Sequence, residues 1–309
     1  MRTYLVRRAL LVVPTLVAVT LLAFLMIHVA PGDPVTVMLG SEYTPEAAAE
    51  LRAAYGLDRP LLIRYVHWLR QVASGRLGRS VFEPRSVSSL FAERAGTTFV
   101  LMLASMTVAV GLGVPLGVFS AVRRDSAADH AARVVSVAGI SMPVFWLGLL
   151  LIALFAVQLN WFPAGGSMAE YGYRVMVLPS AALGVSLMAL IARITRSAVL
   201  DALFADFVRT ARAKGAPGWR VVWMHAFRNS LLPLVTVLGL QIGALLGGAV
   251  LTETVFSLPG LGRLLIDSIA QRDYPVISGV ILVTTTAFVL VNFCVDVLYA
   301  VLDPRVRTD

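Results

Sequence analysis

The sequence predicts an all-α membrane protein, a polytopic bundle of six transmembrane helices. Of its 309 residues, 58% are hydrophobic and only 14% are charged, whereas a soluble domain carries about 25% charged residues. The mean hydropathy is +0.81. The apolar residues also gather into long runs, and a helix needs about 20 such residues to cross the hydrocarbon core. The composition therefore excludes an ordinary soluble protein.

The first apolar run follows Arg7 and Arg8 and has the outward form of a secretion signal. It extends over 21 residues, 9–29, and so exceeds the roughly 7–15 residues of a signal core. The residues that follow it, Ala30-Pro-Gly-Asp-Pro34, offer no small-x-small cleavage site. We therefore expect this run to be retained as the first transmembrane helix.

Five further runs are apolar enough to span, although the run 175–192 is short. Charged residues, proline and glycine cluster between them. Prolines inside these runs, such as Pro115 and Pro143, are compatible with membrane helices because neighbouring helices satisfy the backbone groups that proline frees. The six predicted spans are 9–29, 97–121, 134–158, 175–192, 231–252 and 276–301.

Three glycines repeat every four residues in the fifth predicted span: Gly239, Gly243 and Gly247. Small residues at this spacing let a neighbouring helix approach closely. The pattern favours tight packing, within the bundle or against a partner, over lining of a pore.

The distribution of charge predicts the orientation. The N-terminus, the 122–133 and 193–230 loops and the tail from 302 would share one side, with 15 basic and 6 acidic residues. The opposite side, which includes the long 30–96 segment, carries 11 of each. The positive-inside rule then places both termini in the cytoplasm. Because the basic residues lie between apolar runs, the net charge of +8 indicates contact with membrane lipid and not with nucleic acid.

Sequence motifs for catalysis, nucleotide binding and metal binding are missing. There is no Walker-type loop, no H-E-x-x-H, no C-x-x-C and no G-x-S-x-G. The four histidines are scattered, and the single cysteine, Cys294, lies in an apolar run. We therefore expect no catalytic residue, cofactor or metal site in this chain, and we do not expect it to be an enzyme by itself.

Asp296 is the only carboxylate within the predicted spans, one turn after Asn292. An intramembrane acid is a candidate for a transport pathway. Because Asp296 lies near the cytoplasmic end of the last span, we favour pairing with a cytoplasmic arginine, with a pathway role for Asn292 and Asp296 as the alternative. The middle of the spans carries no ionisable group, so an ion-coupled secondary carrier, which needs such groups, is disfavoured.

The 193–230 loop predicts two short helices joined by a Gly-Ala-Pro-Gly turn at 215–218. Acidic residues come first, at Asp201 and Asp206, and basic residues follow, which complements a helix dipole. A basic helix on the surface of anionic lipid is the alternative interpretation.

In this loop, Phe207-Val-Arg-Thr-Ala-Arg-Ala-Lys-Gly215, continued by His225-Ala-Phe-Arg-Asn-Ser-Leu-Leu-Pro233, resembles the coupling loop of ABC importer membrane subunits. It is similar to the variant found in dipeptide and oligopeptide permeases, although the Glu-Ala-Ala start of the general pattern is not matched. The start of the chain, through His28-Val-Ala-Pro-Gly-Asp-Pro34, and the later segment Glu253-Thr-Val-Phe-Ser-Leu-Pro-Gly-Leu-Gly262 are similar to the B-type subunit of peptide and nickel importers.

The resemblance implies a type I ABC importer transmembrane domain, located in the bacterial cytoplasmic membrane, that forms half of a translocation pathway for peptides. Nickel chelate, glutathione or haem are alternative cargoes, and a self-sufficient secondary carrier is a further alternative. Residues 1–96 would form the first transmembrane helix and an external segment, and 97–309 a core of five transmembrane helices with the cytoplasmic loop at about 193–230. The implied partners are a second homologous permease subunit, two ATP-binding subunits that hold ATP and Mg, and an external substrate-binding protein.

The resemblance also implies roles for particular residues. The contact with the ATP-binding subunits would comprise Asp206, Arg209, Thr210, Ala211, Arg212, Ala213, Lys214 and Gly215, with Ala211 and Ala213 keeping the helix slim enough for a groove. Docking of the binding protein, or an external gate, would involve Asp33, Glu253, Phe256, Pro259, Gly260, Arg272 and Asp273.

Overall fold

The computed structural model describes residues 2–29, 39, 43–54 and 60–302, and regular structure in these ranges is helical apart from one isolated bridge between Arg79 and Ser86. Six long helices correspond to the predicted spans or parts of them: α1 (Arg2–Val29), α5 (Val87–Val122), α6 (Ala127–Ser141), α9 (Val177–Leu203), α12 (Arg228–Val255) and α14 (Tyr274–Leu302). Five helices in these ranges are long and apolar enough to cross a membrane, or six spans if one bent pair counts as a span.

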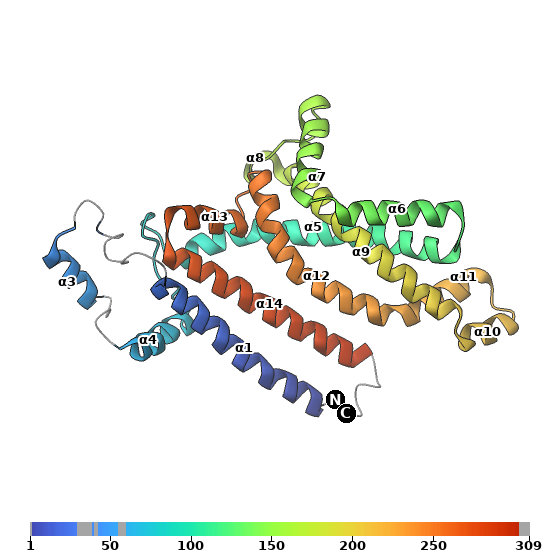
Figure 1. Ribbon diagram of the computed structural model, residues 1–309, viewed down its shortest axis with the longest axis horizontal. Helices are drawn as coiled ribbons and strands as arrows, with labels where there is room; N and C mark the ends of the chain where they lie inside the picture. Colours follow the sequence, from blue (N-terminus) through green and yellow to red (C-terminus); the bar gives the residue numbers. More distant parts are fainter. Residues whose placement is uncertain (1, 30–38, 40–42, 55–59, 303–309) are drawn as a thin grey trace.

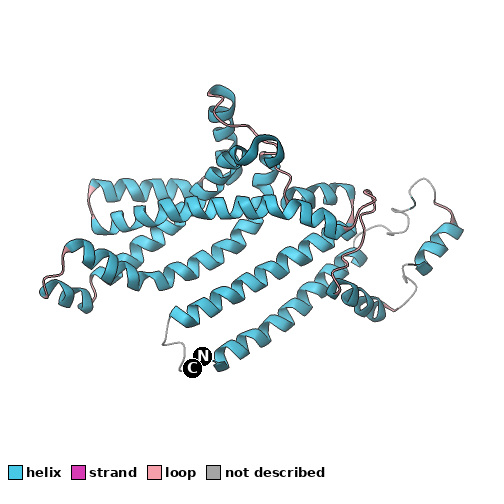
Figure 2. Cartoon of the chain, turned by 180° about the vertical axis from the view of Figure 1, so that it is seen from behind, coloured by secondary structure: helices cyan, strands magenta, loops and turns pink. Residues whose placement is uncertain are grey.

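The long helices lie side by side, and shorter elements cover the two ends of the bundle (Figure 1). At one end lie the turn between α5 and α6, α10 (Asp206–Ala213) and α11 (Gly218–Arg220). We call it the inner end. At the other, the outer end, lie α3 (Pro45–Ala54), α4 (Leu61–Ala73) and α13 (Leu261–Gln271). The view from behind shows the same layer of helices joined by short loops (Figure 2).

Helix α9 forms the centre of the bundle and contacts α5, α6, α7 and α12. Glycines make its contact with α5 close. A Cβ atom added to Gly117 would lie 2.6 Å from the carbonyl oxygen of Ala192, and one added to Gly184 would lie 2.8 Å from that of Ser105. Side chains at these positions would push the two helices apart, so the pair α5–α9 requires glycine here.

The predicted third span, 134–158, is not one continuous helix. It comprises the end of α6, then α7 (Val144–Leu151) and a π-helical continuation, η2 (Ile152–Gln158), and the two parts meet at 102°. Met142 has an extended backbone with ψ of 122°. Pro143 explains the break, because the residue before a proline is disfavoured in the helical region. The segment α7–η2 therefore projects sideways from the bundle as an arm (Figure 1).

The glycine face of α12 packs within the chain. A Cβ atom on Gly239 would lie 2.4 Å from Val295, and one on Gly243 would lie 2.1 Å from Phe288, both on α14. The predicted close packing within the bundle is confirmed for these two glycines, so they give no separate support for a partner subunit. Gly247 is exposed and a Cβ atom there would meet no atom within 4 Å.

Candidate coupling and transport sites

At the inner end, helix α10 has a buried face and an exposed face. Val208 and Ala211 are buried, and α10 contacts η4 (Val221–Phe227), the π-helical turn that leads into α12. The polar face is exposed and comprises Asp206, Arg209, Thr210, Arg212, Ala213 and Lys214. The expectation that Ala211 enters a groove on a partner needs correction, because Ala211 packs inside this chain. Ala213 is exposed, so it remains a candidate for the contact with a partner.

Gly215 ends α10 with a φ of +78°, a left-handed conformation that glycine adopts at little cost. Its amide donates to the carbonyl of Arg212 at 2.9 Å, and the amide of Ala216 donates to that of Ala211 at 3.1 Å. A Cβ atom at Gly215 would meet nothing within 4 Å. The requirement for glycine is therefore one of backbone conformation and not of space.

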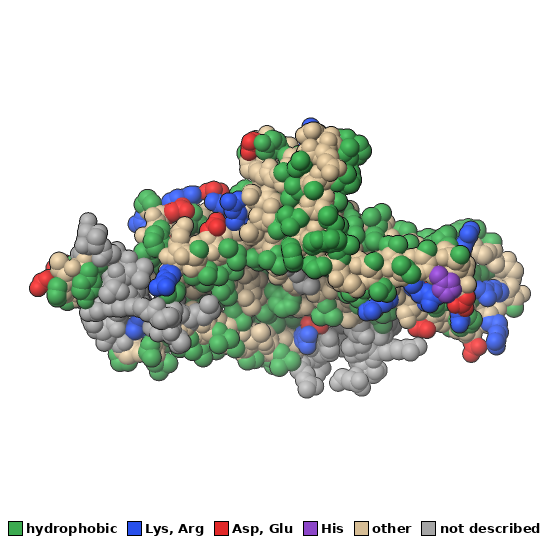
Figure 3. Space-filling model, turned by 45° about the horizontal axis from the view of Figure 1, so that its top comes forward, with side chains coloured by type: hydrophobic (Ala, Val, Ile, Leu, Met, Phe, Trp, Pro, Cys, Tyr) green, Lys and Arg blue, Asp and Glu red, His purple; other side chains and the backbone are tan. Residues whose placement is uncertain are grey.

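The surface around α10 also includes large apolar side chains that the sequence patterns did not single out. Phe204, Phe207, Trp219, Trp223 and Met224 are all exposed. Lysine and arginine side chains gather at the same end of the molecule (Figure 3). We call these five residues and the polar face of α10 the inner surface. Such a mixture of aromatic and basic groups is typical of protein contact sites. A signal was present in the sequence, namely aromatics within a loop of otherwise basic character.

At the outer end, Glu253 is fully buried and holds the start of α13. Its carboxylate accepts hydrogen bonds from Thr98 Oγ1 at 2.6 Å and from the backbone amides of Gly262 and Arg263 at 2.7 and 3.1 Å. Burial raises the pKa of this carboxyl, and the three hydrogen bonds act in the opposite direction. An acid at a helix N-terminus satisfies amides that lack intrahelical partners.

We call residues 253–275, from the end of α12 through α13 to the start of α14, the outer loop. The other residues singled out from the sequence at this end lie in it, apart from Asp33. Phe256 and Asp273 are buried, and the amide of Val276 in α14 donates to the Asp273 carboxylate at 3.4 Å. A Cβ atom on Gly260 would lie 2.1 Å from Cδ of Glu253. Pro259 is half-buried, Arg272 is exposed, and Asp33 lies outside the described residues. Buried side chains offer no contact surface, so Glu253, Phe256 and Asp273 act by shaping the loop.

In the last helix, Asp296 pairs with Arg8 of α1, with 2.5 Å between the carboxylate and Nε. Asn292 donates to the carbonyl of Phe288 on its own helix at 2.9 Å. The ion pair links α1 to α14, whereas the Asn292 bond lies within α14. The pairing of Asp296 with an arginine near the N-terminus agrees with the favoured interpretation.

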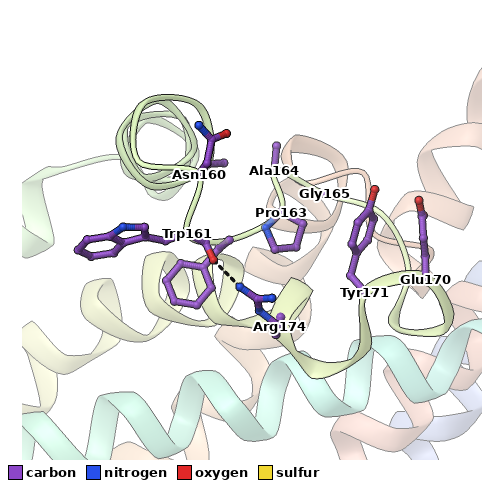
Figure 4. Close-up of a pocket in the computed structure, with 10 residues that line it drawn as sticks. Asn160, Trp161, Pro163, Ala164, Gly165, Glu170, Tyr171 and Arg174 are labelled. Carbon is purple, nitrogen blue, oxygen red and sulfur yellow. Dashed lines mark hydrogen bonds between the residues drawn. The ribbon is translucent and has the colours of Figure 1, made fainter.

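The outer end also has a hollow of about 660 Å³ beside the tip of η2 (Figure 4). Its charged lining residues are Glu170 and Arg174, and Arg174 donates to the carbonyl of Trp161 at 2.8 Å. Among the described residues, no group of three or more His, Cys, Asp or Glu side chains is placed to hold a metal ion.

Comparison with known sequences decides the family. Residues 113–308 match the family described as the binding-protein-dependent transport system inner membrane component, and residues 1–86 match the N-terminal region of such components. The chain belongs to this family. It is a multi-pass inner-membrane transport component, and its membership confirms the resemblance found in the 193–230 loop, at the start of the chain and in the segment 253–262.

Curated members of the family match over their whole length. The di/tripeptide transport system permease protein DppB of Pseudomonas aeruginosa is 44% identical, and the dipeptide transport system permease protein DppB of Escherichia coli K12 is 42% identical. The glutathione transport system permease protein GsiC of Salmonella choleraesuis is also 42% identical. In each case the match covers 99% of both chains.

A solved structure confirms the fold of the family core. A chain of the MetNI methionine ABC transporter in an inward-facing conformation is similar to 69% of this chain, with a TM-score of 0.59 and 18% sequence identity. The match covers 96% of that chain. The all-α fold is therefore that of an ABC importer transmembrane domain.

Proposed function

We propose that this family member is the membrane subunit of an ATP-driven importer of short peptides and forms half of the translocation pathway. The observation that carries the cargo is the identity of 42–44% over the full length with dipeptide and di/tripeptide permeases. Glutathione is the second candidate, because a glutathione permease is similar to almost the same degree. Glutathione is itself a modified tripeptide, so both candidates share peptide bonds and free carboxylates.

The energy for transport comes from ATP-binding partner subunits. The inner surface supports this proposal, because α10 presents the exposed groups of Asp206, Arg209 and Lys214 at the very end of the bundle. A second permease subunit completes the pathway, and an external binding protein delivers the peptide at the outer end, against the loop that Glu253 and Asp273 shape.

The assembly itself is testable. We expect the chain to purify with a second permease subunit and two ATP-binding subunits, and to take up a labelled dipeptide into proteoliposomes only with ATP and the binding protein present. Competition with unlabelled dipeptide and with glutathione separates the two cargoes. Transport by the chain alone would contradict the proposal and support a self-sufficient carrier.

The inner end faces the cytoplasm in this proposal. The 122–133 and 193–230 loops carry 10 of the 15 basic residues and 4 of the 6 acidic ones on the side predicted to be cytoplasmic. They lead into α6 and form α10 and α11 at this end of the bundle, which is the arrangement that the positive-inside rule requires.

Labelling of single cysteines tests the orientation. In a Cys294→Ser background, Ser74→Cys and Ala127→Cys place thiols at exposed positions at the outer and inner ends. A membrane-impermeant maleimide added to intact spheroplasts is expected to label position 74 and to label position 127 only after permeabilisation. The reverse pattern would invert the orientation.

A further inference from the structure

The inner end contains an ionic cluster around the buried side chain of Asp129, and the proposed function assigns no role to it. The Asp129 side chain is fully buried and accepts four hydrogen bonds. Nε and Nη2 of Arg196 donate at 2.8 and 2.7 Å, Ser120 Oγ donates at 2.5 Å, and the amide of Asp125 donates at 3.0 Å. Arg196 Nε also lies 3.1 Å from Ser120 Oγ.

These bonds join three helices at one point. Ser120 lies in the last turns of α5, Asp129 in the first turn of α6, and Arg196 in α9. A forked arginine–carboxylate contact fixes both distance and orientation. Removal of one partner from such a buried pair leaves a charge without compensation, so the pair resists separation. The close approach of α5 and α9 at Gly117 lies beside the cluster, next to Thr195.

The cluster lies between the inner surface and the rest of the bundle. Helix α9, which carries Arg196, ends at Leu203, and α10 begins at Asp206. On the other side, α6 leads through the bend at Pro143 to the α7–η2 arm. In this arm, a Cβ atom on Gly148 would lie 3.0 Å from Phe256 in the outer loop. The cluster therefore adds a fixed polar link between α9, α5 and α6 to the direct packing of α9 against α5, α6, α7 and α12.

We propose that the Asp129–Arg196 pair is a coupling lock: it makes α5, α6 and α9 move as one unit when the ATP-binding subunits displace α10. Asp129 and Arg196 are thus positioning residues for transport. This inference rests on the proposed function. It predicts that a complex without the pair still hydrolyses ATP but transports less peptide for each ATP hydrolysed.

The test is a double-mutant cycle in the full complex in proteoliposomes, read as peptide transported per ATP hydrolysed and normalised to assembled complex. Asp129→Asn, Arg196→Gln and the double variant are each expected to lower this ratio roughly tenfold. Because both residues serve one contact, the double variant is expected to lose no more than either single variant. Additive losses, or an unchanged ratio, would overturn the proposal, since a purely structural pair lowers the amount of complex and not the ratio.

Arg133 provides the matched control. It lies 3.6 Å from the same carboxylate but on the same helix, four residues after Asp129, so it joins no second helix. Arg133→Gln is expected to keep the wild-type ratio, and a tenfold loss there would show that local charge matters and not the link to α9. If Arg196→Gln fails to assemble, Arg196→Lys retains the positive charge without the forked contact. If the two single variants Arg196→Lys and Asp129→Asn both transport as much peptide per ATP as the wild type, the proposal is also overturned.

Failure of the proposed function gives a different result. In that case the wild-type complex itself shows no peptide-stimulated ATP hydrolysis, whereas failure of the coupling lock leaves the wild type active and the variants indistinguishable from it.

Discussion

Replacement of Gly260 by alanine is expected to destabilise the outer end by about 3 kcal/mol or more, because it strips partners from a buried carboxylate. The new Cβ atom would lie 2.1 Å from Cδ of Glu253 and 2.2 Å from Oε1. Glu253 would have to leave the amides of Gly262 and Arg263, and these amides would then lack acceptors. The measurement is the melting temperature of the detergent-purified chain, together with its yield from membranes.

Gly96 gives the matched control for this prediction. It lies in α5 two residues before Thr98, at the same end of the bundle, and a Cβ atom there would meet nothing within 4 Å. Gly96→Ala is expected to leave the melting temperature unchanged or to raise it slightly, because alanine favours a helix over glycine by about 1 kcal/mol. Equal melting temperatures for the Gly260 and Gly96 variants would show that the Glu253 network does not hold the outer loop.

Substitution on the exposed face of α10 is expected to abolish peptide-stimulated ATP hydrolysis while the chain still folds. Ala213→Trp adds a large side chain to the inner surface, where it would keep a partner subunit from seating. Gly215→Val disturbs the same surface through the backbone, since a β-branched residue at a φ of +78° costs about 1–2 kcal/mol. The assay is ATP hydrolysis by the reconstituted complex with and without peptide, and co-purification of the ATP-binding subunits.

The control for these variants is Ala127→Trp, which places the same side chain at an exposed position in the first turn of α6, also at the inner end. It is expected to retain stimulated hydrolysis. Wild-type hydrolysis and transport in both Ala213→Trp and Gly215→Val would mean that α10 is a membrane-surface helix without a coupling role. Ala211→Trp does not serve this purpose, because Ala211 is buried within the chain and its replacement would disturb α10 itself.

The α12 glycines and the 134–158 segment show what a sequence pattern does not predict: which helix is the packing neighbour, and in which direction a helix continues. The spacing of Gly239 and Gly243 correctly predicted close packing, but only the structure shows that α14 is the neighbour. The hydropathy of 134–158 is uniform across Pro143, because hydropathy measures burial in lipid and carries no information on direction. The bend of 102° follows from the backbone restriction at Met142 together with the packing of α7 over α9 and α12.

The sequence by itself determined the membrane class, the existence of the spans, the family and the turn that begins at Gly215, because composition, run length and local backbone preference act over a few consecutive residues. The tertiary structure decided which side chains are free to meet a partner. Ala211 and Glu253 look like surface residues in a polar stretch, yet both are buried. Asp129 and Arg196 are 67 positions apart and meet only because α6 packs on α9. Burial and ion pairing depend on which helices adjoin, and that is a property of the packed bundle that no local pattern contains.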